Sequence, residues 1–207
     1  MEDVLEVYER PYDVKFPVVC MDEASRQLLE ETRTPFVDSH GVRITDYEYI
    51  RHGEQKIWMA TEPLAGWRTT DVTERRTAID WAHFVKEYII DRYPDATKIV
   101  LVMDNLNTHT IASFYEAYPP ELAKALADRL EIHYTPKHGS WLDMAETELS
   151  VLQKQCLGKR RIPTKEQLKA EIKAWEVARN SQQKGVNWQF TTSDARTKLK
   201  RLYPVVE

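Results

Sequence analysis

The 207-residue sequence has only two cysteines and no long apolar run, and both scarcities exclude whole classes of protein. Cys20 and Cys156 lie in apolar surroundings with no CxxC spacing, which predicts neither a disulfide framework nor a zinc knuckle, but two reduced core residues. The longest apolar runs, such as residues 99–103, fall far short of the roughly 20 residues that a membrane-spanning helix needs. The acidic start at residues 2–6 lacks the basic and apolar segments of a secretory signal. We therefore expect a cytoplasmic protein.

Internal repeats and low-complexity tracts are also missing. Hydrophobic residues make up 42% of the chain and charged residues 30%, a composition that argues against a disordered chain, a collagen or a coiled-coil rod. The length is typical of one globular domain with at most a modest appendage.

Charge is distributed unevenly, although the net charge is only -4. The segment 154–201 contains thirteen Lys and Arg against four acids, a net charge of +9 that leaves -13 for the remainder. An acidic body with a basic C-terminal quarter suggests a polyanionic partner such as nucleic acid. The alternative is that these cations only solvate exposed helix faces.

Hydrophobic periodicity predicts an α/β fold built on a mixed sheet, with three antiparallel strands and two parallel strands flanked by helices. Strands are expected at 17–21, 45–52, 56–61, 67–72, 98–103 and 131–135, with a turn at residues 53–55. Helices are expected at 2–10, 77–92, 110–130 with an interruption at the two prolines 119 and 120, 142–156, from 164 onward, and 194–202.

Three acids in this layout could share one site. Asp22 follows the first strand, Asp104 follows the buried strand 98–103, and Glu146 lies on the helix after the last strand. Neighbouring strands lie about 5 Å apart, so the first two acids can approach closely and the helix can bring up the third. Such a cluster repels itself unless a divalent cation neutralises it, and carboxylate oxygens favour Mg²⁺ or Mn²⁺. Two such ions would support phosphodiester cleavage or strand transfer.

Each acid also has a purely structural explanation. Asp22 could cap the segment after its strand, and Asp104 could form an Asx-turn with Asn105. Glu146 could close a capping box with Asp143. Spacing alone leaves both explanations open.

Six short strings occur in order over nearly the whole chain: VVCMDE (18–23), EPLAGWR (62–68), VTERRT (72–77), DNLNTH (104–109), YTPKHGSWLDMAE (134–146) and FTTSDARTKL (190–199). Together they resemble the catalytic domain of bacterial insertion-sequence transposases related to mariner, which belong to the DDE endonuclease superfamily. The resemblance implies an RNase H-like fold, expected here as a mixed sheet with extra C-terminal helices.

The resemblance further implies that Asp22, Asp104 and Glu146 form the catalytic triad and hold two Mg²⁺ ions, which Mn²⁺ can replace. Glu148 lies about 200° around the helix from Glu146, so it is not expected to reach the same ions. The family usually has Asn where this chain has Asp143, and the extra negative charge could tighten or distort metal binding.

We expect DNA phosphates to contact cations both near the triad and in the basic C-terminal quarter. The expected DNA-binding residues are Arg75, Arg76, His109, Lys137, His138, Lys159, Arg160, Arg161, Arg196, Lys198 and Arg201. For His109 the expected role is to orient a phosphate or a metal-bound water, and the alternative is a loop histidine whose hydrogen bonds are satisfied locally.

The predicted organisation is a lead-in segment at 1–16, a catalytic core at 17–157 and a basic helical extension at 158–207. The predicted function is hydrolysis of DNA at transposon ends and strand transfer into target DNA by a homodimer at the nucleoid, and the resemblance suggests TA target sites. Relatives carry a helix-turn-helix module ahead of this domain, and no recognition helix is visible here. We therefore expect salt-sensitive, largely sequence-independent DNA binding by a fragment, a truncated copy or one half of a split transposase.

Two other functions stay open at this point. The chain could be a catalytically silent relic that uses its basic quarter to bind DNA or a partner. It could also be a nuclease with an RNase H-like fold that cleaves RNA–DNA hybrids with the same metal chemistry.

Overall fold

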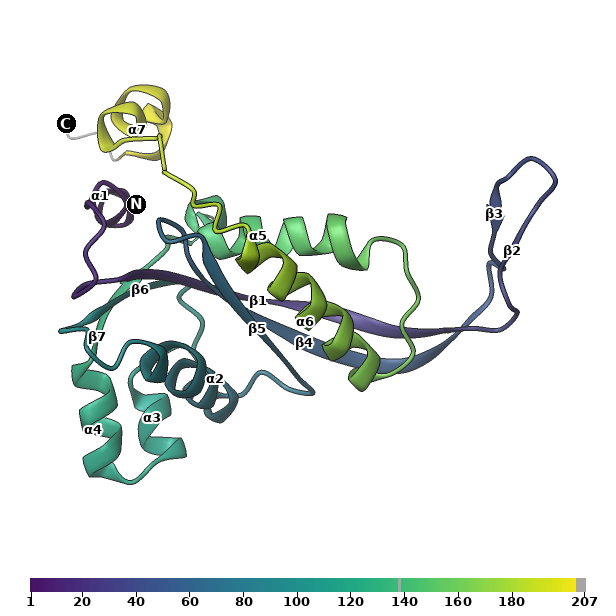
Figure 1. The fold of residues 1–207 in the computed structure, drawn as a ribbon. Coiled ribbons are helices and arrows are strands. Elements are labelled where there is room, and N and C mark those ends of the chain that lie inside the picture. Colours follow the sequence, from purple (N-terminus) through teal and green to yellow (C-terminus); the bar gives the residue numbers. More distant parts are fainter. Residues whose placement is uncertain (138, 204–207) are drawn as a thin grey trace.

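The computed structural model describes residues 1–137 and 139–203, and a mixed five-stranded sheet forms its centre (Figure 1). The strands are β1 (Val18–Glu31), β4 (Tyr49–Glu62), β5 (Trp67–Thr73), β6 (Ile99–Met103) and β7 (Leu130–Tyr134), in the spatial order β5-β4-β1-β6-β7. The pairs β1–β4 and β4–β5 are antiparallel, whereas β1–β6 and β6–β7 are parallel. The predicted mixed sheet of three antiparallel and two parallel strands is confirmed.

Helices cover both faces of the sheet and enclose two hydrophobic cores. One face carries α1 (Glu2–Tyr8), α5 (Met144–Leu152), α6 (Lys165–Ser181) and α7 (Thr192–Lys198), and the other carries α2 (Ala78–Phe84), α3 (Ala112–Ala117) and α4 (Pro120–Asp128). The side chains of β6 alternate between the cores, with Val100 and Val102 facing α5 and α6, and Leu101 and Met103 facing α2 and α3. All five residues of β6 are buried, as its continuous apolar run predicts.

The helices begin where polar caps are available. The Thr77 hydroxyl oxygen accepts the backbone N–H of Asp80, and the Thr77 backbone N–H donates to the Asp80 carboxylate in return, which starts α2. Thr164 caps α6 through the N–H of Gln167. None of the helices in the described part of the chain combines the length and apolar character that crossing a membrane requires.

Two predicted strand boundaries are wrong, both because β1 and β4 pair with each other over a long distance. β1 does not end before Asp22 but continues to Glu31, since β4 carries its ladder onward after the parallel pairing with β6 stops at Cys20. Residues 53–55 do not form a turn. Gly53, at φ +87°, lies inside β4 where the register with β1 shifts beside Leu28, as in a β-bulge.

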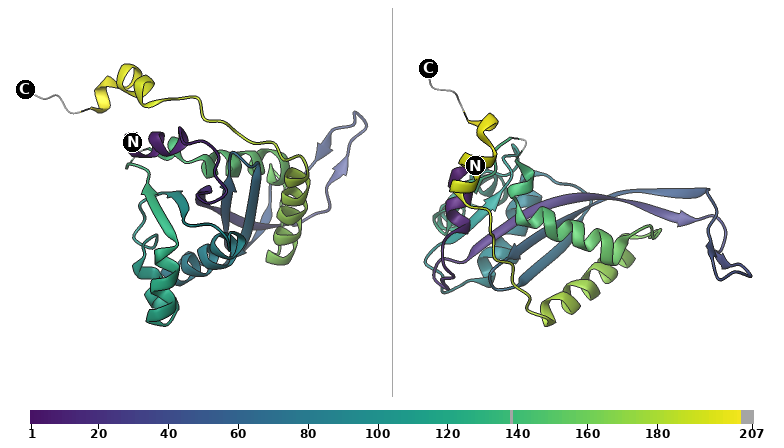
Figure 2. Two further views of the ribbon diagram at one scale, coloured as in Figure 1. Left: turned by 60° about the vertical axis from the view of Figure 1, so that its left-hand side comes forward. Right: turned by 90° about the horizontal axis from the view of Figure 1, so that it is seen from above.

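The far ends of β1 and β4 leave the core as a two-stranded projection, which we call the arm (residues 29–51). The arm ends in a small hairpin of β2 (Phe36–Val37) and β3 (Arg43–Ile44), which the sequence did not predict. Figure 2 shows the arm in two further views, extending away from the helices. It exposes large apolar side chains, with Val37 64% and Tyr47 86% exposed.

Candidate active site

Asp22 and Asp104 come from the neighbouring strands β1 and β6. The parallel ladder between β1 and β6 ends with the pair Cys20 and Val102, and Asp22 follows two residues later on β1. Asp104 is the first residue after β6. β1 continues past Asp22, whereas β6 stops before Asp104, so the two carboxylates lie on neighbouring strands just beyond the point where their parallel pairing stops, close enough for the charge of Asp104 to act on Asp22.

Glu146 joins them from α5. Asp143 caps this helix by accepting the backbone N–H of Ala145 at 2.8 Å. Ala145, Leu149 and Leu152 face the core, which leaves Glu146 exposed. Asp22, Glu23 and Glu146 line one groove between β1 and α5.

The carboxylates in this region are close enough to change one another's ionisation. Burial raises the pKa of Asp22 to about 7, against the stabilising backbone N–H of Glu23, and the charges of Glu23, Asp104 and Glu146 raise it further. Burial, and then the charge of Asp22, raises the pKa of the Asp143 carboxyl well above its usual range. A cation placed among these groups would remove the repulsion.

The donor set fits a hard divalent cation, although the acids are not gathered around one point. All candidate ligands are carboxylates, which Mg²⁺ and Mn²⁺ prefer, and Asp143 Oδ2 is buried with no hydrogen-bond partner. Within residues 1–137 and 139–203, however, no three acidic, histidine or cysteine side chains are arranged to hold an ion together. Ligation by the whole triad therefore requires a side chain to move, and the exposed Glu146 can change rotamer.

His109 lies in the interior, not at the surface where a DNA phosphate would reach it. Its ring is 1% exposed, with Nδ1 2.5 Å from Asp104 Oδ1 and Nε2 3.4 Å from Glu23 Oε2. Burial alone would lower the pKa of His109, but the two carboxylates outweigh it and raise that pKa to about 9. His109 thus contacts Asp104 and Glu23 in the interior, and its expected role in orienting a phosphate or a metal-bound water stays a prediction.

Glu23 is a member of this region that the sequence analysis missed. Its side chain is 2% exposed and receives Arg76 Nη1 at 3.0 Å, besides facing His109. The signal available in the sequence was an acid next to Asp22 on a strand, where successive side chains point to opposite faces. Arg76, a predicted DNA contact, has this acid partner within the protein and keeps 52% of its side chain exposed.

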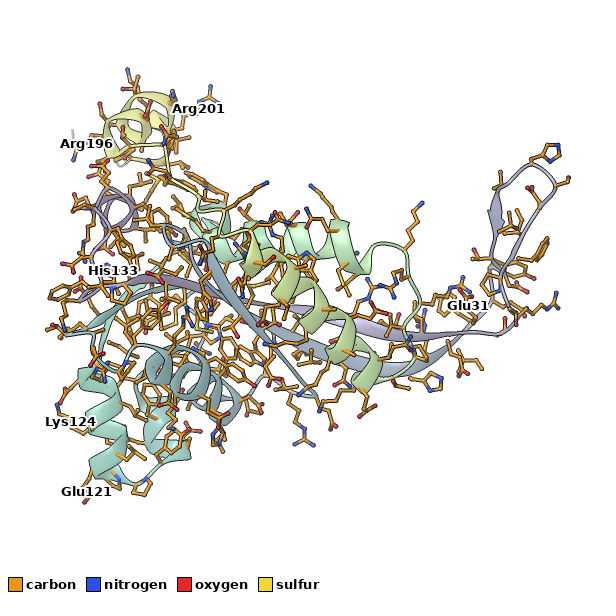
Figure 3. All side chains as sticks on the ribbon, viewed as in Figure 1. Glu31, Glu121, Lys124, His133, Arg196 and Arg201 are labelled. Atoms are coloured by element: carbon orange, nitrogen blue, oxygen red, sulfur yellow. The ribbon has the colours of Figure 1, made fainter. Side chains whose placement is uncertain are left out.

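The basic C-terminal quarter is largely paired with acids of the same chain. Figure 3 labels Arg196 and Arg201 on the C-terminal helices and Glu31 at the base of the arm. Among the predicted DNA-binding residues of this quarter, the ion pairs are Arg160–Glu171, Arg161–Glu31, Arg196–Glu2 and Lys198–Asp194. Four of the expected DNA-binding cations are exposed and form no salt bridge within the described ranges: Arg75, Lys137, Lys159 and Arg201. His138 lies outside the described residues.

Sequence comparison assigns most of the chain to one family. Residues 17–169 match the family model described as DDE superfamily endonuclease. The match includes Asp22, Asp104 and Glu146. A comparison with curated protein sequences finds no match.

Structures of Mos1 transposase share the fold. The Mos1 transposase paired-end complex with left transposon end matches with a TM-score of 0.59 and 14% identity, over 86% of this chain and 53% of that chain. The Mos1 mariner paired end complex with Mn gives 0.58 and 15%, over 87% and 54%, and the Mos1 Strand Transfer Complex gives 0.56 and 14%, over 84% and 51%. The chain thus spans about half the length of these proteins, and the predicted RNase H-like fold is confirmed.

Proposed function

The chain belongs to the DDE superfamily of endonucleases, and we propose that it is the catalytic domain of a transposase, which hydrolyses DNA at transposon ends and transfers the freed strands into target DNA. The observation that carries this proposal is the meeting of Asp22 and Glu146 in one groove, with Asp104 at the end of the neighbouring strand β6. The names of the Mos1 structures, which include a strand transfer complex, support the same reaction.

We propose that Asp22, Asp104 and Glu146 hold two Mg²⁺ ions, for which Mn²⁺ can substitute. When bound, such ions activate the attacking oxygen and stabilise the leaving oxygen of a phosphodiester. The chain's own residues orient this site. His109 holds Asp104 from the interior, Glu23 holds His109, and Asp143 starts the helix that presents Glu146. Mos1 complexes named as containing Mn and Mg support this choice of metal.

The partners in this proposal are DNA and a second copy of the chain. The exposed cations Arg75, Lys137, Lys159 and Arg201 are the proposed phosphate contacts. The arm supports a homodimeric active complex, because large exposed apolar side chains on a projecting element are typical of a surface that another chain covers. A helix-turn-helix module, on the same or a separate chain, would supply sequence recognition at the nucleoid.

We keep the division into a lead-in (1–16), a catalytic core (17–157) and a basic extension (158–207) as a proposal. Residues of α1, α6 and α7 pack into the same hydrophobic core as α5, so in this division the outer segments support the core.

The test is DNA cleavage with and without the triad. The chain, alone and supplemented with a recognition module, is incubated with transposon-end duplex and Mn²⁺, and nicking is followed on a gel. We expect activity that Asp22→Ala and Asp104→Ala abolish, whereas unchanged activity in these variants would refute the mechanism. Cleavage of an RNA–DNA hybrid in preference to the duplex would identify the chain as a stand-alone nuclease. DNA binding without metal and without cleavage would identify it as a catalytically silent relic.

A further inference from the structure

β5 is an edge strand, and α6 lies across it (Figure 1). Side chains of α6 bond to backbone groups on the open edge of β5, where a neighbouring strand would otherwise pair. Asn180 Nδ2 donates to the Arg68 carbonyl at 2.7 Å, and Asn180 Oδ1 accepts the Arg68 backbone N–H at 3.0 Å. Glu176 Oε2 accepts the Thr70 backbone N–H at 2.8 Å and its hydroxyl at 2.7 Å. Backbone groups that an edge strand leaves open are satisfied by α6, so the helix is fixed to β5 at two alternate residues.

This fixed helix also holds α5 through Glu148. Arg179 Nη2 of α6 donates to Glu148 Oε1 at 3.0 Å, and Arg68 Nε of β5 lies 3.1 Å from Glu148 Oε2. Arg68 is 1% exposed and Glu148 6% exposed. The carboxylate is thus buried between two guanidinium groups, each from a different element.

The orientation of α5 decides where Glu146 points. The helix has nine residues, too few to be stable in isolation, so its position comes from its contacts. Residues two apart on a helix differ by about 200°, and Glu148 turned inward therefore places Glu146 outward at the groove with Asp22. Apolar contacts at Ala145 and Leu149 determine which face of α5 packs on the core. The charge-assisted contacts of Glu148 are directional, so they restrict the rotation of α5 about its own axis.

We propose that Glu148 is a positioning residue, which fixes the rotation of α5 through Arg68 and Arg179 and so places Glu146 to ligate metal. The assignment rests on the proposed function, because it assumes that Glu146 is a ligand. It gives α6 a part in the active site, since the helix that closes the β5 edge also sets the third acid.

The test compares Glu148→Gln, which removes the charge at nearly constant shape, with Glu171→Gln. The control breaks the exposed pair between Arg160 and Glu171 of α6, which does not involve α5. Two readouts are measured on the full chain: Mn²⁺ affinity by titration calorimetry well below the melting temperature, and hydrogen–deuterium exchange of residues 144–152. If Glu148→Gln does not fold, Arg179→Lys serves, since it keeps the charge but loses the planar fork on a side chain that is 19% exposed.

We expect Glu148→Gln to weaken Mn²⁺ binding at least tenfold and to speed exchange at 144–152, with β6 unchanged and Glu171→Gln close to wild type. If Glu148→Asp retains part of the Mn²⁺ affinity that Glu148→Gln loses, the result would support a positioning role. Wild-type Mn²⁺ affinity and exchange in the folded variant would overturn the proposal. If the unaltered chain binds no Mn²⁺ while the variant still loosens 144–152, the proposed function fails but the control of α5 by Glu148 stands.

Discussion

The imidazole of His109 and the carboxylate of Asp104 form a buried contact, with Nδ1 2.5 Å from Oδ1. The ring has Glu23 on its other side and is 1% exposed. Asp104 itself keeps about a third of its side chain exposed at the end of β6. An interior histidine therefore contacts one side of the carboxylate while the other side stays open to solvent, and under the proposed function this contact would orient Asp104 as a metal ligand.

Replacing His109 should impair catalysis more than folding. Groups that orient metal ligands typically contribute about 10- to 100-fold to metal affinity or activity, and we expect a loss of that size in the cleavage rate of His109→Gln. The measurement is single-turnover nicking of end-sequence DNA in Mn²⁺. His133→Gln is the control, since His133 also contacts two acids, Asp3 and Glu131, but lies away from the triad. Equal rates in both variants would remove His109 from the site.

Neutralising Asp22 should stabilise the metal-free protein while removing its response to metal. The folded-state pKa of Asp22 is raised to about 7 from an ordinary value of 3.8, chiefly by burial. The group therefore contributes stability below pH 4 that is lost as the pH rises to about 7. At pH 8, we expect Asp22→Asn to melt roughly 3–8 °C above wild type in EDTA, for a gain of about 1–2 kcal/mol.

Mn²⁺ should reverse that order. Binding to the folded state alone raises the melting temperature, and this rise should occur in wild type but not in Asp22→Asn. Scanning fluorimetry from pH 4 to pH 8, with EDTA or with Mn²⁺, gives both results. If Asp22→Asn melts at the same temperature as wild type in EDTA across this pH range, the ionised Asp22 carboxylate does not destabilise the metal-free protein.

Asp143 offers a second way to relieve the repulsion without touching the triad. Asn caps helices about as well as Asp, so Asp143→Asn keeps the contact to Ala145 while removing a buried carboxyl whose pKa is raised by burial and by Asp22. We expect an unfolding free energy about 1 kcal/mol higher, measured by urea denaturation. Asp143→Ala loses the cap and should lower it by about 1 kcal/mol. Two equally destabilised variants would argue that the charge itself is needed.

Local sequence patterns predicted the elements whose structure depends on near neighbours. The apolar run before Asp104 predicted β6, and Thr77 predicted the start of α2. The length of β1 was not predictable in this way, because residues beyond Asp22 are held by pairing with residues of β4 that lie 18 to 35 positions further along the chain. The arm follows from the same long-range pairing, whereas the hairpin at its tip pairs residues only six to eight positions apart.

In the candidate site, too, local patterns predicted some features, whereas contacts between distant segments determine the others. Strand ends and helical spacing brought forward Asp22, Asp104 and Glu146. The burial of His109 and the pairing of Arg196 with Glu2 depend on contacts between distant segments, which composition does not record. A basic C-terminal quarter therefore predicted a polyanion partner, whereas eight of its thirteen cations form salt bridges with acids of the chain itself.

The packing of the C-terminal extension on the sheet can be tested at one glycine. Gly66, in the turn between β4 and β5, has φ +67°, and a Cβ there would lie 2.7 Å from the backbone of Gln183, Lys184 and Gly185. Because backbone cannot yield as a side chain can, we expect Gly66→Ala to lower the unfolding free energy by roughly 3 kcal/mol. Gly41→Ala is the control, with φ +78° but no atom within 4 Å, so only the backbone cost of about 1 kcal/mol applies.

Urea denaturation of both variants measures this difference. Hydrogen–deuterium exchange of residues 182–190 then shows whether the loss comes from that segment, whose Val186 N–H donates to the Pro63 carbonyl at 2.7 Å. A Gly66→Ala protein no less stable than Gly41→Ala, with unchanged exchange at 182–190, would mean that the segment does not lie on this turn in solution. The seating of α6 on β5, and with it the contact from Arg179 to Glu148, would then need another anchor.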